Sequence, residues 1–234
     1  MPIVKTEAFV LKSFRYGDTS KIVTLFTKDF GKINAIVKGA RTYKSRLCGV
    51  LESMNYISII IYLKENRDLQ LVTNAEYKKS FSNILNDFDK LQASFRIIEM
   101  LNKSVIENDI NKSIFELLIK TYEMLNQAEK NIYKCVLYFQ MELVKILGVG
   151  PDFSELDNEF ETFFKNNEFY LTKSQLGELK ELKNNSIDKL LETSIEHNML
   201  ISLVEGYEKY LLLHTQGIKF YKSKKIFLEL KQTI

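Results

Sequence analysis

Several residue types are scarce in this sequence of 234 residues, and each scarcity excludes a class of structure. The only cysteines are Cys48 and Cys135, the only histidines are His197 and His214, and tryptophan is absent. Two well-separated cysteines in a chain expected to be cytoplasmic indicate reduced packing residues and not a disulfide. Neither histidine belongs to a cluster with metal-ligand spacing, so we expect no structural metal and no cofactor.

Long hydrophobic runs are also missing. The longest, at 57–63, has about seven residues and includes a serine and a tyrosine, whereas a membrane-spanning helix needs roughly 20 apolar residues. Lys5, Glu7 and Lys12 interrupt the N-terminal segment where a signal peptide would need an apolar core. We therefore expect a cytoplasmic protein that has no contact with a membrane.

Motifs for catalysis are missing as well. No serine, cysteine or threonine lies in a recognisable nucleophile motif with either histidine. No glycine-rich phosphate loop is present, and Gly148-Val149-Gly150 is followed by Pro151, which would spoil a cradle of backbone amides. The sequence therefore predicts a protein that is not an enzyme and has no small-molecule substrate.

Positive charge, in contrast, is concentrated at the front of the chain. Residues 1–50 hold ten Lys and Arg against three Asp and Glu, while residues 51–234 hold 23 against 27. The densest run, at 38–46, has four cations and no acid, which favours a polyanionic partner, although a solvated basic loop has the same composition. The candidate contacts with nucleic acid are Lys12, Arg15, Lys21, Lys32, Lys38, Arg41, Lys44 and Arg46, with Phe14, Tyr16 and Tyr43 interleaved as rings that can stack on unpaired bases.

Turn residues and β-branched runs predict five strands in the first 79 residues. Their ranges are 6–14, 21–27, 32–38, 56–63 and 69–76. Five short strands of this kind are typical of a small closed barrel, in which the OB type is the common nucleic-acid-binding form. An SH3-like barrel has a similar periodicity, and the pattern alone does not separate the two.

The hydrophobic period changes from two to between three and four residues after residue 79. Helices are predicted at 84–98, with Ser82 or Asn83 as the cap, and at 114–125, 132–147 and 187–214, with one short strand at 168–171. The fold class is therefore α+β, with a five-stranded OB-type barrel at 1–79 and a mainly α-helical domain at 80–234. The lysine-rich end, at 219–231, could be a second phosphate contact or a frayed terminus.

Four blocks in the first 47 residues resemble the bacterial recombination mediator family RecO. They are KTEAFVL at 5–11, YGDTSKIVTLFT at 16–27, FGK at 30–32, and KGAR at 38–41 with KSRL at 44–47. The resemblance implies an N-terminal OB domain followed by a helical domain. It also implies a protein that binds single- and double-stranded DNA, anneals complementary strands, and helps RecR to load RecA onto DNA coated by the single-strand-binding protein SSB.

The same resemblance puts Lys38, Arg41, Lys44 and Arg46 on the family's basic block and docks the C-terminal tail of SSB on the helical domain. Many members of the family carry a four-cysteine zinc site in the segment that corresponds to 151–172. This chain has no cysteine there, so the segment is expected to be a metal-free remnant or to fold differently. Two alternatives stay open, a protein-interaction adaptor and an RNA-associated OB protein, both without annealing activity.

Overall fold

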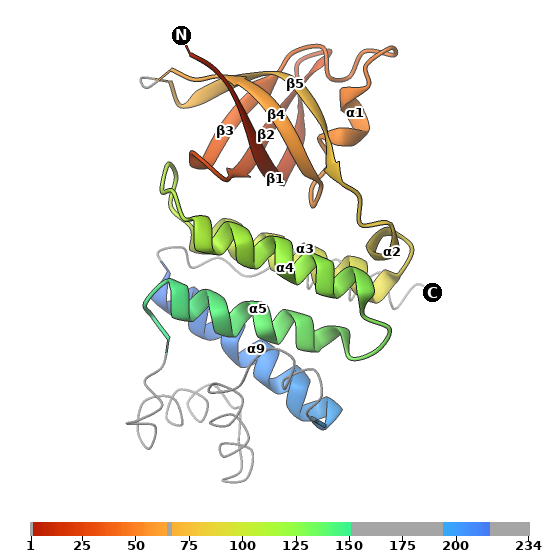
Figure 1. Cartoon of the computed structure of the whole chain (residues 1–234), viewed down its shortest axis with the longest axis vertical. Helices are drawn as coiled ribbons and strands as arrows, with labels where there is room; N and C mark the ends of the chain where they lie inside the picture. The colour runs from red at the N-terminus through yellow and green to blue at the C-terminus, as the bar shows by residue number, and fades with distance from the viewer. Residues whose placement is uncertain (1, 65–66, 151–193, 216–234) are drawn as a thin grey trace. The chain divides into compact units, whose positions relative to one another are not determined.

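Five strands form a closed barrel at the N-terminal end of the chain. The computed structural model describes residues 2–64, 67–150 and 194–215 (Figure 1). The barrel strands, in chain order, are β1 (Ile3–Tyr16), β2 (Ser20–Thr27), β3 (Gly31–Val37), β4 (Tyr56–Tyr62) and β5 (Leu69–Lys79). They close in the order β1-β2-β3-β5-β4, and all neighbours are antiparallel except the parallel pair of β3 and β5. The predicted barrel is confirmed.

Strand alternation explains which side chains fill the barrel. In β3 every second residue is buried, because successive side chains point to opposite faces of a strand. A short helix, α1 (Leu47–Val50), connects β3 to β4 and lies against β5 (Figure 1). A five-stranded barrel in this order, with its helix between the third and fourth strands, is the OB type, so the SH3-like alternative is excluded. The barrel core consists mainly of Ala8, Val10, Val23, Leu25, Ala35, Val37, Ile57, Ile59 and Ile61.

The segment at 107–109 packs closely on β3. Residue 107 forms a parallel bridge to Lys32, whose carbonyl accepts a hydrogen bond from the backbone of Asn108. Gly31 has a φ of +65°, and a Cβ there would lie 2.1 Å from the carbonyl oxygen of Asp109. Glycine is therefore required at this position both by its backbone conformation and by the close approach of the segment.

The helix predicted at 132–147 begins where expected, but the one predicted at 84–98 does not. The segment at 84–98 is divided into α2 (Ser82–Leu85) and α3 (Phe88–Ser104), and α3 is capped by Asp87, whose side chain accepts from the backbone of Lys90. The prediction of Ser82 or Asn83 as its cap was wrong, because Asp87 supplies a carboxylate that satisfies a free amide of the first turn. The remaining described helices are α4 (Lys112–Gln127), α5 (Ile132–Ile146) and α9 (His197–His214).

The described residues form two compact units, one up to Glu116 and another from Leu117 onward. The second unit is held together by α5 and α9, where the Gln140 side-chain amide donates to the Val204 carbonyl at 2.8 Å. The domain boundary between residues 79 and 80 stays a prediction. The segment at 151–172, the strand at 168–171 and the lysine-rich end lie outside the described residues. No helix within the described ranges has the length and apolar character to cross a bilayer.

Both cysteines are free thiols. Cys135 is buried in α5, as expected of a packing residue, but Cys48 is exposed in α1. The expectation that both pack in the core was therefore wrong for Cys48, because the four-residue helix α1 buries its Val50 side and leaves its other side in solvent.

Candidate nucleic-acid interface

The basic run predicted from the sequence forms the connection between β3 and α1. It starts at Gly39, whose φ of +67° turns the chain out of β3, and the backbone and hydroxyl of Thr42 both donate to the Gly39 carbonyl. The methyl group of Ala40 is buried in the barrel core, while Tyr43 is fully exposed. We call residues 38–46 the basic loop. Its buried alanine holds it on the barrel and leaves its charged side chains outside.

Arg41 joins the basic loop to the turn between β1 and β2. Its backbone amide donates to the Thr19 carbonyl at 2.8 Å, and its guanidinium Nη1 donates to the Gly17 carbonyl at 3.0 Å. The register of the strands brings further residues to this end of the barrel, since Arg15 pairs with Lys21 and Lys21 pairs with Val37. Arg15, Lys38, Arg41, Lys44, Arg46 and Tyr43 are therefore brought together at this end.

Aromatic and aliphatic side chains continue this surface along the strands. Phe14 and Tyr16, at the end of β1, are 51% and 53% exposed. Phe14 pairs with Ile22, and Ile22 pairs with Ile36, so three partly exposed apolar residues lie in one row across β1, β2 and β3. The sequence pointed to Phe14 but not to Ile22 or Ile36, because the apolar residues of β2 do not alternate regularly with polar ones. Lys12 is exposed in the neighbouring row, paired with Thr24.

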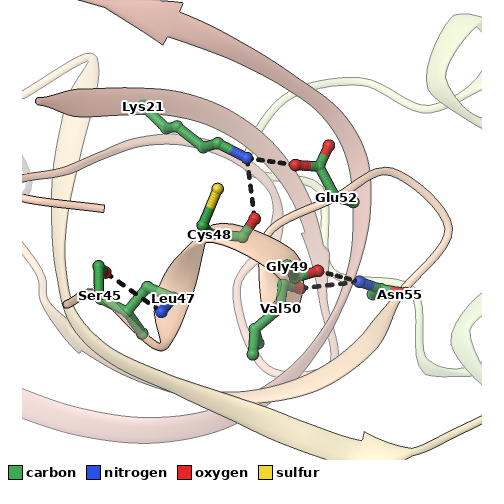
Figure 2. A network of polar contacts seen from close by, with 8 residues as sticks. All are labelled: Lys21, Ser45, Leu47, Cys48, Gly49, Val50, Glu52 and Asn55. Carbon is green, nitrogen blue, oxygen red and sulfur yellow. Dashed lines mark hydrogen bonds and ion pairs between the residues drawn. The ribbon is translucent and has the colours of Figure 1, made fainter. Parts of the chain in front are cut away.

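Lys21 lies inside the fold and not on this surface. Its side chain is only 7% exposed, and its ammonium donates to the Cys48 carbonyl at 3.0 Å and to a Glu52 carboxylate oxygen at 2.5 Å (Figure 2). The charge is thus already paired, and the ammonium would have to leave both acceptors before it could meet a phosphate. Lys21 is therefore not one of the exposed cations of this surface.

Lys32 is likewise engaged by the protein. Its ammonium donates to the carbonyls of Asn102 at 3.0 Å and Val105 at 2.5 Å, where α3 ends. Burial lowers the pKa of Lys32, and the neighbouring charge of Lys12 acts in the same direction, while Glu107 opposes both. A cation at the C-terminus of a helix meets unpaired carbonyls and the negative end of the helix dipole. The position therefore gives Lys32 a structural contact in α3.

All four cations of the basic loop lack an acidic partner in the described part of the chain. No carboxylate of a described residue lies within 4.0 Å of Lys38, Arg41, Lys44 or Arg46. On another part of the barrel, by contrast, Lys5 pairs with Glu76 at 3.4 Å, and Lys78 pairs with a glutamate of β1 at 2.8 Å. Unpaired cations beside exposed rings can meet a phosphate backbone and its bases together.

Comparisons with known proteins are consistent across the chain. Family models described as Recombination protein O N terminal and Recombination protein O C terminal match residues 1–81 and 85–224. The "DNA repair protein RecO" of Chloroherpeton thalassium is 35% identical over 153 residues, which are 65% of this chain and 59% of that protein. The protein of the same name from Salinibacter ruber is 36% identical over 149 residues, or 64% of this chain and 57% of that protein.

A third protein named "DNA repair protein RecO", from Alkaliphilus metalliredigens, is 32% identical over 149 residues, which are 64% of this chain and 60% of that protein. The chain thus spans a little under three fifths of the length of the first curated relatives that it matches. One family model by itself covers residues 85–224, which is more than half of the chain.

Proposed function

Because the chain belongs to the Recombination protein O family, we propose that it is a recombination mediator in DNA repair that binds DNA through the basic loop. The observation that carries the proposal is the set of cations without acidic partners among the described residues, Lys38, Arg41, Lys44 and Arg46, at one end of an OB barrel. An OB barrel uses its strand face and its loops to hold oligonucleotides. The loop supplies phosphate contacts, and no step of covalent catalysis is involved.

The exposed rings support binding of unpaired strands in particular. Tyr43 is exposed within the basic loop, and Phe14 and Tyr16 are exposed at the end of β1, which leads into the turn that Arg41 contacts. Stacking on a base is worth about 1–3 kcal/mol for each ring and does not depend on the identity of the base. Contacts with backbone phosphates do not require unpaired bases, so double-stranded DNA binds through the cations alone. A site of this kind binds a strand without sequence preference, and a protein that anneals complementary strands needs binding of this sort.

The proposal extends to the partners that act with this family. We propose that the protein anneals complementary strands and helps RecR to load RecA on DNA coated by SSB, and that the C-terminal tail of SSB docks on the helical part of the chain. These assignments follow from the family relationship, and the basic loop by itself carries only the contact with DNA.

Fluorescence anisotropy with a labelled single-stranded oligonucleotide tests the contact with DNA. The double variant Lys38→Ala with Lys44→Ala should weaken binding and flatten the dependence of log K on log salt by about 1.4, since each phosphate contact to a single strand contributes roughly 0.7. The matched control is Lys112→Ala with Lys130→Ala, which removes the same charge from exposed positions of α4 and the turn that follows it. Equal losses in the two variants would contradict a localised site.

Three further measurements separate the proposed function from its alternatives. Annealing of SSB-coated complementary oligonucleotides, with and without RecR, tests the role as a mediator directly. Binding that does not saturate at high micromolar protein would indicate an adaptor that contacts proteins and not DNA. Competition in which RNA displaces DNA at equal or lower concentration would indicate an RNA-associated protein.

A further inference from the structure

The basic loop is fixed by hydrogen bonds at both of its ends. At its start, the backbone and the guanidinium of Arg41 both bond to the turn between β1 and β2. Within it, the Ser45 amide donates to the Thr42 carbonyl at 2.9 Å. At its end, the Ser45 hydroxyl accepts from the Leu47 amide at 3.2 Å, so the loop runs directly into α1 (Figure 2). Contacts that fix the position of α1 therefore also fix the end of the basic loop.

The helix α1 is too short to be stable alone. It has four residues, and a single turn of helix cannot repay the entropy of fixing its backbone in water. The backbone amides of Leu51 and Glu52 donate to the carbonyls of Leu47 and Gly49, and two side chains from outside the helix add further donors. Asn55 donates to the carbonyls of Gly49 and Val50, at 2.8 Å and 3.1 Å, and Lys21 donates to the carbonyl of Cys48 at 3.0 Å (Figure 2).

Lys21 adds a charge to this arrangement. It reaches from the start of β2, in the barrel wall, to a helix that follows it by more than 20 residues. The ammonium also holds the Glu52 carboxylate, whose side chain is 59% exposed and thus stays hydrated. A cation beside the carbonyl end of a helix is favourable in its own right. The residue links the rigid barrel to α1 and, through Ser45 and Leu47, to the basic loop.

We propose that Lys21 is a positioning residue, which presents the basic loop in its binding conformation and does not itself contact DNA. The inference rests on the proposed function for the ligand, but the conformation of the loop is independent of it. A loop that is already ordered loses little conformational freedom when it binds, whereas a free loop must be ordered at the expense of affinity. Lys21 therefore sets the affinity of the loop cations without adding to their number.

The main test compares Lys21→Met with Lys44→Ala in the full chain, using the same labelled oligonucleotide over a range of salt. Methionine keeps the apolar stem and removes the donor. We expect Lys21→Met to weaken binding on the order of tenfold, the loss that comes with ordering one or two side chains, while the salt slope stays that of the wild type. Lys44→Ala should flatten the slope by about 0.7. A Lys21→Met protein with wild-type affinity, or with the slope change of Lys44→Ala, would overturn the inference.

The variant Glu52→Gln distinguishes a positioning role of Lys21 from a direct contact with DNA. Glutamine keeps an oxygen that accepts from the ammonium, so a positioning role predicts wild-type affinity and slope. If Lys21 instead contacted DNA, loss of the competing carboxylate would free its charge, and binding would tighten with a slope steeper by about 0.7.

Hydrogen exchange in the absence of DNA tests the order of the loop independently of binding, and the amide of Arg41 serves as an internal control for a general loss of stability in Lys21→Met. The amides of Arg41, Ser45 and Leu51 donate in the free protein and should exchange slowly before any DNA is added. In Glu52→Gln they should stay slow, and in Lys21→Met those of Ser45 and Leu51 should become faster. Fast exchange of all three in the wild type would refute a preformed loop. Failure of the wild type to bind DNA would instead refute the proposed function and leave the exchange result standing.

Discussion

Replacing Lys32 with methionine separates a structural lysine from a DNA contact. The sequence placed Lys32 among the cations that meet DNA, but its ammonium donates to two carbonyls at the end of α3. The methionine side chain replaces the apolar part of the lysine side chain, but it leaves both carbonyls without the ammonium donor. The change should therefore affect the attachment of α3 to the barrel, and not the salt dependence of DNA binding.

The size of the effect follows from the two hydrogen bonds. A bond from a charged group contributes about 1.5–3 kcal/mol, so the two together would contribute about 3–6 kcal/mol. Burial of the ammonium offsets part of this, as the lowered pKa of Lys32 indicates. We expect a net loss of about 2–3 kcal/mol in the free energy of unfolding, which corresponds to a Tm lower by about 4–12 °C for a chain of this length.

Thermal and urea unfolding, followed by circular dichroism, measure this loss, and Lys12→Met is the matched control. Lys12 is exposed in a neighbouring row of the barrel, and its substitution should change the stability by less than about 0.5 kcal/mol. DNA binding at low temperature, where both variants are folded, completes the comparison. The reasoning would be refuted if Lys32→Met kept the wild-type Tm and flattened the salt slope by about 0.7.

Other substitutions test the basic loop, the glycine turn and the loss of stability at acid pH. Tyr43→Ala should weaken binding of single strands by about 1–3 kcal/mol with an unchanged Tm, and Tyr43→Phe should restore it, as titration by anisotropy will show. A left-handed backbone costs an alanine roughly 1–2 kcal/mol. Gly17→Ala, whose Cβ would lie in open space, should lose only this much stability in urea unfolding, whereas Gly31→Ala should lose more, because its Cβ would meet a carbonyl. Burial raises the pKa of Glu7, but hydrogen bonds from Lys78 and a tyrosine outweigh it and leave the pKa below its usual value. The ion pair of Glu7 with Lys78 therefore stabilises the fold above the ordinary glutamate pKa, and this stabilisation is lost as the pH falls through the lowered pKa. In Glu7→Gln the free energy of unfolding should therefore depend less on pH below about 4.5. If Glu7→Gln lost stability at acid pH just as the wild type does, ionised Glu7 would not be the stabilising group.

Local pattern was sufficient for the strands and for most helices. The β-branched and aromatic runs predicted five strands close to their observed bounds, because alternation is a local property of the chain. The start of α3 was missed for a local reason too. The hydrophobic stripe continues through the break at Asn86, and only the capping carboxylate of Asp87 shows where the helix begins. Strand order and the parallel pair of β3 and β5 depend on contacts that no periodicity contains.

The scarcity of cysteine, histidine and apolar runs, and the concentration of charge in 1–50, are properties of the sequence by itself. They single out the basic loop, and its cations lie at the end of the barrel that also carries the exposed rings of β1. Which cations remain available was decided by tertiary structure. Lys21 and Lys32 have the same side chain as Lys38 and Lys44, but their ammonium groups lie beside carbonyls of α1 and α3. Charge is counted along the chain, whereas pairing depends on acceptors that are distant in sequence and meet a lysine only after folding.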